Sequence, residues 1–371
     1  MTSLLRRPAR LILPAVAVLT AMGSTAAVAS PVQAGLPIGH VHSAPAKPAK
    51  FNWHPFKLIN GWKSASTKHL ATGTPAWALR DGVVYLRGAI RQPNAAGHPT
   101  FASLPKYARP ASDLYIQVST SSDVPGILYI GSDGALEAYD GNAYSFTSLA
   151  TVSYPTASIK SHQLKLLNGW QSSQPTYGTG DPSYSISHGV VYLSGSMHSA
   201  GSSPLAFVLP KAARPTHALF ITVYTVDGSS PGVVEILPQG EVDMAGVGAP
   251  GYTSLASISF PVAGTKWHKF KLEAGWKPFT KFDTVAPAYA VVNGVVYLDG
   301  AMYQAPAGDG LWTSIPAAAR AADDVAFEVM TTSDSVGAVT MAASQGLVSS
   351  RPLSNAQMMT SLAGIAYPPS S

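Results

Sequence analysis

Hydrophobic and polar residues alternate along short stretches of the chain, and glycine-containing turns separate these stretches. In residues 75–87 the two arms flank the turn Asp81-Gly82, which places Leu79 opposite Val84. Alternation with a period of two predicts β-strands, and glycine tolerates the positive φ that a tight hairpin turn requires. The segment therefore predicts a β-hairpin with one face in a hydrophobic core.

The chain contains three copies of one unit. The run Gly-Val-Val-Tyr-Leu returns unchanged twice, and Gly-Trp and Thr-Ser-Leu-Ala motifs return around each copy in the same order. Equivalent positions lie 105 to 108 residues apart, which is close to the usual size of one domain. We therefore expect three domains with their own cores, named repeats 1, 2 and 3 below: residues 51–158, 159–264 and 265–371.

Each repeat contains about seven or eight short strand patterns and no amphipathic helix, which predicts an all-β fold. Three tandem jelly-roll-like β-sandwich domains are the architecture that these patterns favour. The outer face of the hairpin carries Val83 and Tyr85, and valine and tyrosine recur there in both other repeats. A sheet face in contact with water is usually polar, so something must cover these residues. We expect a monomer whose repeats pack as an intramolecular pseudo-trimer, with Tyr85, Tyr192 and Tyr297 near its axis.

Residues 1–34 have the pattern of a secretory signal peptide. Three arginines among the first ten residues precede an apolar stretch, and small residues at the cleavage-site spacing end at Ala29 and at Ala34. Sec export and twin-arginine export are both compatible with this segment. A flexible leader rich in Pro and Ala is expected at residues 35–50. The pattern therefore predicts a secreted, extracellular protein.

Composition narrows the partners that can be expected. The 371-residue chain has 24 Lys and Arg, 19 Asp and Glu, and no cysteine. Removing the three signal-peptide arginines lowers the formal charge from +5 to +2, which argues against a nucleic-acid partner. The lack of cysteine excludes disulfides, thiolate metal sites and a cysteine nucleophile. No second long apolar run is present, so no membrane span is expected.

A series of short motifs resembles the repeat of a known family. In repeat 1 the motifs are Asn60-Gly61-Trp62, Val84 to Gly88, Leu104 to Pro110, Asp133-Gly134 and Ser148 to Tyr154. The series is similar to the repeat of bacteriophage tail-fibre and receptor-binding proteins and of related secreted actinobacterial proteins. The resemblance implies a β-sandwich knob that binds cell-surface glycan or protein, often as a trimer.

The sequence contains no motif of a known reaction. It lacks the Gly-x-Ser-x-Gly elbow, the Walker A loop, the Rossmann fingerprint and a His-Glu-x-x-His zinc motif. We therefore expect no enzymatic activity, no cofactor and no resident metal. One alternative is a metal held by His54, His162 and His268, because these equivalent imidazoles would meet if the repeats closed around an axis.

Residues that recur in all three repeats are expected to be architectural. We expect core positions, rather than sugar-stacking platforms, for Trp62, Trp170 and Trp276, because tryptophan is usually largely buried. Arg109 and its counterparts are expected to order a loop by donating to backbone carbonyls, since guanidinium is a donor only.

Ligand recognition is expected in the loops that differ between repeats, since loops on a rigid scaffold often carry function. Five aromatic residues give these loops surface suited to stacking on sugar rings: Tyr139, Tyr144, Tyr252, Tyr303 and Trp312. The alternative is that these rings pack on their own sandwich.

Together these features favour a secreted, non-enzymatic binding protein that recognises an extracellular carbohydrate or a cell-surface polymer. One alternative is a structural or assembly protein whose repeats self-associate without a small ligand. A secreted hydrolase is a third possibility, although nothing in the sequence places together the two carboxylates that glycoside hydrolysis needs.

Overall fold

Short antiparallel strands build the fold, in line with the predicted all-β class. The computed structural model describes residues 50–370, apart from residues 69, 94–96, 141, 226–231, 247, 306–307, 309, 333–334 and 352. The predicted signal peptide, and the predicted leader except its last residue, lie outside the described residues. The α-helices of the described chain are two four-residue turns, α1 (Gln174–Tyr177) and α2 (Leu353–Ala356). No helix in this part is long and apolar enough to cross a membrane.

Each repeat contributes eleven strands. In repeat 1 they are β1 (His54–Pro55), β2 (Lys63–Ser64), β3 (Ala76–Arg80), β4 (Val83–Arg87), β5 (Ala89–Arg91), β6 (Thr100–Ser103), β7 (Leu114–Ser119), β8 (Pro125–Ile130), β9 (Ala135–Tyr139), β10 (Thr147–Ser148) and β11 (Ser153–Pro155). In repeat 2 they are β12 (His162–Gln163), β13 (Trp170–Ser172), β14 (Ser183–Ser187), β15 (Val190–Ser194), β16 (Ser196–Ser199), β17 (Leu205–Val208), β18 (Leu219–Val223), β19 (Gly232–Ile236), β20 (Glu241–Ala245), β21 (Thr253–Ser254) and β22 (Ser259–Pro261). In repeat 3 they are β23 (His268–Lys269), β24 (Trp276–Pro278), β25 (Ala288–Val292), β26 (Val295–Asp299), β27 (Ala301–Gln304), β28 (Leu311–Ser314), β29 (Val325–Thr331), β30 (Ser335–Ala342), β31 (Leu347–Arg351), β32 (Thr360–Ser361) and β33 (Ala366–Tyr367).

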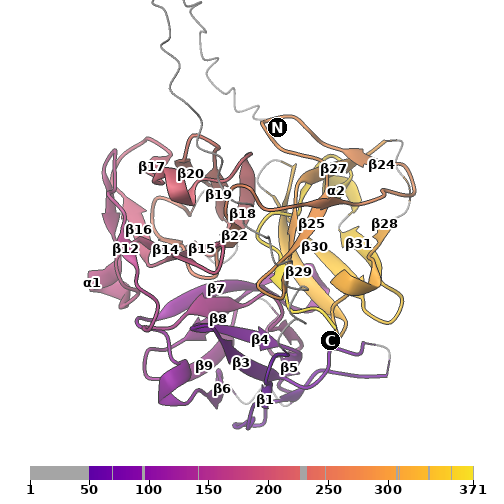
Figure 1. Cartoon of the computed structure of the whole chain (residues 1–371). Helices are drawn as coiled ribbons and strands as arrows, with labels where there is room; N and C mark the ends of the chain where they lie inside the picture. Colours follow the sequence, from indigo (N-terminus) through magenta and orange to yellow (C-terminus); the bar gives the residue numbers. More distant parts are fainter. Residues whose placement is uncertain are drawn as a thin grey trace, which may run out of the picture. The chain divides into compact units, whose positions relative to one another are not determined.

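The three repeats have equivalent strand pairing (Figure 1). One four-stranded sheet has the order β1-β3-β4-β11, and its counterparts are β12-β14-β15-β22 and β23-β25-β26-β33. A second array, β6-β9-β8-β7, recurs as β17-β20-β19-β18 and β28-β31-β30-β29; in repeat 3 it joins the remaining strands through β32. The predicted hairpin register is confirmed, because Leu79 pairs with Val84 and the equivalent residues pair in the other repeats. The hairpin therefore holds the same topological position three times.

Each repeat has its own hydrophobic core, as its repetition predicts. The recurring Trp62, Trp170 and Trp276 lie in these cores, with 3%, 5% and 4% of their surface exposed. The indole nitrogens of Trp62 and Trp170 donate to the backbone oxygens of His98 and Ser203. The prediction that these tryptophans are structural is confirmed.

The recurring arginines order a loop, which also confirms the prediction. Arg109 Nε donates to the carbonyl of Leu104 at 3.2 Å, and Arg214 and Arg320 make the equivalent bond at 2.9 Å. Gly134, with φ +96°, lies against the Arg109 side chain, since a Cβ at this position would be 2.6 Å from Arg109 Nε. The Asp-Gly turn of the sequence motif and the arginine are therefore parts of one local structure.

The outer faces of the three hairpins pack against one another. Val83 and Tyr85 of β4 form one cluster with the equivalent valines and tyrosines of β15 and β26, and each of these side chains is at most 3% exposed. The hydroxyls of Tyr85 and Tyr192 are 3.4 Å apart. The expectation that Tyr85, Tyr192 and Tyr297 lie together is confirmed. The apolar outer face is covered by the equivalent faces of the other repeats.

Each repeat also contacts both others through equivalent backbone groups. In every junction one amide N–H donates to a carbonyl of the neighbouring repeat, at 2.9 to 3.1 Å. The three bonds run from Asp113 to Gly178, from Ala218 to Asp283 and from Asp324 to Ala71.

The cores interlock in the same cyclic sense. Ala150 of repeat 1 lies in the core of repeat 3, Ala256 of repeat 2 packs against that of repeat 1, and Ala363 of repeat 3 lies in that of repeat 2. The contacts therefore form a closed cycle within the compact unit of residues 47–371.

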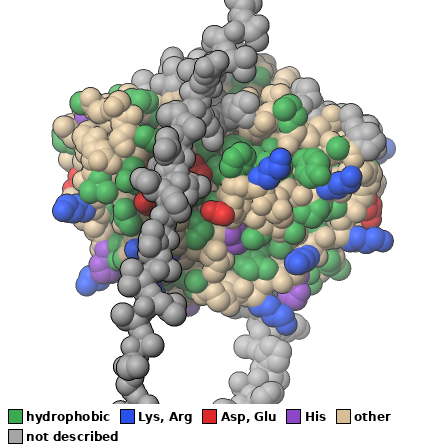
Figure 2. All heavy atoms as spheres, turned by 90° about the horizontal axis from the view of Figure 1, so that it is seen from above, with side chains coloured by type: hydrophobic (Ala, Val, Ile, Leu, Met, Phe, Trp, Pro, Cys, Tyr) green, Lys and Arg blue, Asp and Glu red, His purple; other side chains and the backbone are tan. Residues whose placement is uncertain are grey.

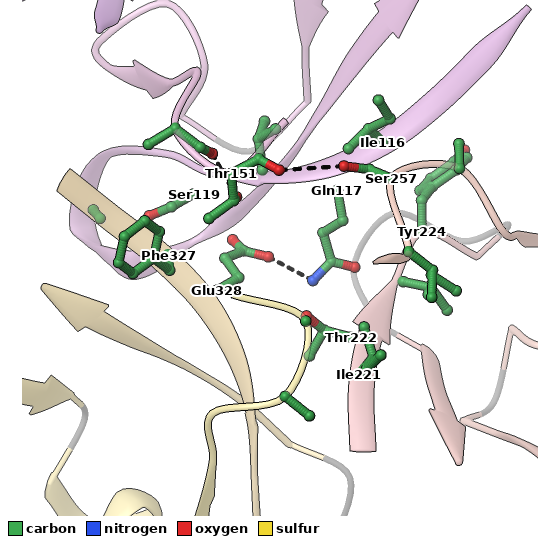
Figure 3. Close-up of a pocket in the computed structure, with 18 residues that line it drawn as sticks. Ile116, Gln117, Ser119, Thr151, Ile221, Thr222, Tyr224, Ser257, Phe327 and Glu328 are labelled. Atoms are coloured by element: carbon green, nitrogen blue, oxygen red, sulfur yellow. Dashed lines mark hydrogen bonds between the residues drawn. The ribbon is translucent and has the colours of Figure 1, made fainter. Parts of the chain in front are cut away.

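A small polar cavity lies where β7, β18 and β29 meet (Figure 3). It has a volume of about 50 Å³, and the equivalent residues Gln117, Thr222 and Glu328 line it. Gln117 Nε2 donates to one carboxyl oxygen of Glu328, while the other, Oε1, has no hydrogen-bond partner among the described residues. Burial raises the pKa of Glu328 well above its ordinary value, and the bond from Gln117 offsets this only in part. The cavity therefore favours the neutral carboxylic acid.

We predict that Glu328→Gln stabilises the protein at neutral pH, because the raised pKa of the buried Glu328 makes the wild-type fold less stable once the unfolded chain can ionise, and glutamine does not titrate. The wild-type free energy of unfolding should fall as pH rises above about 4, where the unfolded chain releases this proton before the folded chain does. Urea unfolding at several pH values measures both effects. The exposed Glu273→Gln is the control; equal pH dependence of wild type and Glu328→Gln would contradict the prediction.

Candidate functional site

The three junctions between repeats contain equivalent clefts with different contents. They are named junctions 1–2, 2–3 and 3–1 after the repeats that they join. Three equivalent positions line each cleft: one just before β7, β18 or β29, one just before β12, β23 or β1, and one at the end of β15, β26 or β4. These positions hold Ser112, Ser161 and Ser194 in junction 1–2, His217, Trp267 and Asp299 in junction 2–3, and Asp323, Trp53 and Arg87 in junction 3–1.

Junction 2–3 is filled by its own side chains. His217 Nε2 lies 2.6 Å from the Asp299 carboxylate, and the two side chains are only 12% and 7% exposed. The second carboxylate oxygen of Asp299 accepts the backbone N–H of Gly300. Together with the ring of Trp267, this pair leaves a cleft of only about 40 Å³.

Junction 3–1 is filled in a different chemical way. The guanidinium of Arg87 lies 4.4 Å from the ring centroid of Trp53, a distance typical of a cation–π contact. Burial raises the pKa of Asp323, and the positive charge of Arg87 acts in the opposite direction. The cleft that Trp53 and Arg87 line has a volume of about 40 Å³. A second cleft of about 380 Å³, lined by Ala71, Asp323 and Ala343, lies in the same junction.

Junction 1–2 is open. With three serines in place of an ion pair and an indole, its cleft has a volume of about 410 Å³, within the range of small-molecule sites. Gly180, with φ +72°, brings the backbone of repeat 2 close to Ser112, since a Cβ there would lie 2.7 Å from the serine hydroxyl. The two walls are therefore held in close contact on one side, and the cavity is not the result of repeats lying apart.

Hydroxyl groups dominate the described lining of this cleft. They come from Ser112, Thr156, Ser161, Thr179, Ser183, Ser185, Ser194 and Ser257. The carboxylate of Asp181 accepts a bond from Gln163 Nε2 at 3.2 Å, and it is the one charged group among the described lining residues. Glycoside hydrolysis generally uses two carboxylates, and the described lining contains one.

Repeat 2 has also gained polarity on strand β14, beside the cleft. Ser183 and Ser185 stand where repeat 1 has Ala76 and Ala78, and where repeat 3 likewise has two alanines. Ser185 is 2% exposed, and its hydroxyl has no hydrogen-bond partner among the described residues. An unpaired buried hydroxyl costs about 1–3 kcal/mol, so its presence is not explained by stability.

A cluster of tyrosines adjoins the cleft on the side of α1. The ring centroids of neighbouring members lie 4.6 to 6.4 Å apart. The members are Tyr115 and Tyr129 of repeat 1 and Tyr177, Tyr224 and Tyr252 of repeat 2. Tyr129 donates to Asp113, the neighbour of the cleft residue Ser112. Burial is the main cause that raises the pKa of Tyr115, Tyr129, Tyr224 and Tyr252, so these phenols stay neutral.

The structure separates the five aromatic residues that the sequence predicted as ligand contacts. Trp312 is fully buried in the core of repeat 3 and Tyr252 is 1% exposed, so neither presents a ring to a ligand, contrary to expectation. Tyr139 is half-buried near Tyr115 and Tyr224. Tyr144 packs on Trp62 and Tyr303 on Phe279, and both remain partly exposed. The five therefore lie at separate places: Trp312, Tyr144 and Tyr303 pack within their own repeats, and Tyr139 and Tyr252 lie where repeats 1 and 2 meet.

The three equivalent histidines do not gather. His54, His162 and His268 each stack on an aromatic residue of the neighbouring strand in their own repeat, with centroids 4.6 to 5.3 Å apart. Among the residues that the structure describes, no three His, Cys, Asp or Glu side chains are grouped to hold a metal. The alternative of a histidine-bound metal is therefore wrong.

The cleft residues could have been found by comparing the three repeats position by position. Serine replaces tryptophan, charged residues and alanine at several positions, all in one junction. On the face in Figure 2, Lys and Arg side chains are spread apart and much of the surface is uncharged. No protein-family model, curated protein or solved structure shows significant similarity to this chain.

We predict that Ser185→Ala raises the free energy of unfolding by about 1 kcal/mol, because it removes an unpaired buried hydroxyl. The reverse change in repeat 3, Ala290→Ser, is the matched control and should lower stability by a similar amount. Urea unfolding of the two variants and the wild type measures these differences. A destabilised Ser185→Ala would show that the hydroxyl has a partner in solution.

Proposed function

We propose that the protein is a secreted, non-enzymatic binding protein that recognises an extracellular carbohydrate or a cell-surface polymer, and that the cleft of junction 1–2 is its binding site. One observation carries the proposal: the clefts lined by Trp53 and Trp267 have volumes of only about 40 Å³, whereas the equivalent cleft beside Ser161 has a volume of about 410 Å³. An open cleft of this size lies within the range of sites that bind small molecules.

The chemistry of the lining supports a saccharide ligand. Serine and threonine hydroxyls can each donate and accept, which matches the hydroxyl groups of a sugar. Asp181 and Gln163 add a strong acceptor and a planar amide at the rim. The partly exposed Ile159 supplies apolar surface for the face of a sugar ring. Binding sites for small ligands usually combine such apolar walls with a few directed polar groups.

The architecture within which we place this site is an intramolecular pseudo-trimer of three jelly-roll-like β-sandwich domains. The cyclic backbone bonds, the interlocking alanines and the shared tyrosine cluster of the hairpins support it. The resemblance of the repeat motifs to tail-fibre and receptor-binding proteins supports a role at a cell surface.

We predict that the double variant Gln163→Ala/Asp181→Ala weakens saccharide binding about tenfold or more, since loss of a hydrogen bond to a charged group costs about 1.5–3 kcal/mol. A glycan array identifies the saccharide, and isothermal titration measures its dissociation constant. Lys269→Ala, at the position of repeat 3 equivalent to Gln163, is the matched control and should bind like wild type. Stable self-association without binding to any saccharide would favour a structural role instead.

A further inference from the structure

We infer that the open cleft takes a single non-acidic pyranose ring in the place that a tryptophan side chain fills at the other two junctions. The inference rests on the proposed carbohydrate-binding function and names the ligand class and the position of the ring. It follows from the equivalence of the three junctions, each of which has the same backbone bond between repeats.

The missing tryptophan indicates the kind of group that fits. Trp53 and Trp267 line the filled clefts, and the equivalent Ser161 begins repeat 2 at the open one. An indole and a pyranose are both compact rings with two apolar faces, so one can occupy the space of the other. The open cleft exceeds each filled one by about 370 Å³, which leaves room for one ring and its substituents.

The missing ion pair indicates the polarity of the ligand. Ser112 and Ser194 replace His217 and Asp299, so hydroxyls stand where junction 2–3 has an imidazole and a carboxyl group. A group seated between them exchanges neutral hydrogen bonds with both walls. In junction 1–2, the place that corresponds to the His217–Asp299 pair is therefore suited to the hydroxyl groups of a sugar ring.

The remaining charge sets the selectivity. Asp181 is the one charged side chain in the described lining, and neither Lys nor Arg is among these residues. A uronate or sialate carboxylate would meet a like charge without a cation to balance it, and burial of an unpaired charge is costly. Neutral hexoses and N-acetylhexosamines avoid this cost.

The test introduces the side chains that fill junction 2–3 at the equivalent positions of the open cleft. The triple variant Ser112→His/Ser161→Trp/Ser194→Asp installs the residues of the filled cleft. The probes are methyl glycosides of glucose, mannose, galactose, N-acetylglucosamine and glucuronic acid, titrated against the mature chain by calorimetry. We expect wild type to bind at least one neutral glycoside, with one site per chain. Its affinity for the glucuronide should be at least tenfold weaker. The triple variant should bind the neutral glycoside at least tenfold more weakly than wild type does.

Two further variants keep the test decisive. Ser161→Trp alone fills the ring position if the triple variant does not fold, and it should also abolish binding. Trp267→Ser, at the matching position of junction 2–3, is the control and should retain the affinity of wild type.

The outcomes separate the two proposals. Wild type that binds no glycoside, in this panel or on the glycan array, overturns the carbohydrate-binding function. Wild type that binds a glycoside with an affinity unchanged by Ser161→Trp leaves that function standing and overturns the placement in the cleft. Preference for the glucuronide overturns the non-acidic ligand class.

Discussion

The structure depends on burial of the valine–tyrosine face that each hairpin presents outside its own core. Six side chains, two from each repeat, form one cluster with at most 3% exposure. Burial of a valine-sized side chain is worth about 1.5–3 kcal/mol, so the cluster contributes on the order of ten kcal/mol before losses of entropy. The net gain from one hydrogen-bonded pair in a junction is about one tenth of that. Burial of the hairpin faces is therefore a main contribution to the association of the repeats, and the junction residues Trp53 and Trp267 pack against the same cluster.

This division of roles explains how the junctions can differ. Because the hairpin cluster, the interlocking alanines and the backbone bonds fix the geometry, the side chains at each junction can change without loss of the assembly. Junction 2–3 uses a His–Asp pair and junction 3–1 an arginine against an indole. Junction 1–2 has neither, yet its backbone bond has nearly the same length. Duplication of a unit thus produces three equivalent positions, of which one is available for another purpose.

Sequence patterns predicted the parts of this structure that local chemistry determines. The hairpin register follows from alternation and an Asp-Gly turn, the buried Trp62 from its recurrence, and the bond of Arg109 from its motif. The meeting of Tyr85 with Tyr192 could be predicted because an apolar face on both sides of a strand demands a cover. These inferences need no knowledge of how distant segments are placed.

The cleft could not be predicted in the same way, because its walls come from separate segments. Ser112, Ser161 and Ser194 are unremarkable in the sequence, and only the packing of two repeats brings them to one cavity. The burial of Trp312 and Tyr252 was missed for a related reason: a loop that differs between repeats can turn its aromatic ring inward as readily as outward. Sequence variation among repeats therefore marks where function can reside, and packing decides which of the variable residues are accessible.

Two buried polar groups, the carboxyl of Glu328 and the hydroxyl of Ser185, have an oxygen without a hydrogen-bond partner among the described residues. Each such oxygen lowers the stability of the fold. Glu328 sits where all three repeats meet, so a ligand that reached it would have to separate β7, β18 and β29. Ser185 sits beside a cleft that is bounded by two repeats and accessible without such a separation. An unpaired polar group in the first place lies among the contacts of all three repeats, whereas in the second it lies at a single junction. Position relative to the closed cycle, rather than polarity alone, therefore distinguishes these two buried polar groups: Glu328 lies among the contacts of all three repeats, and Ser185 lies at one cleft between two of them.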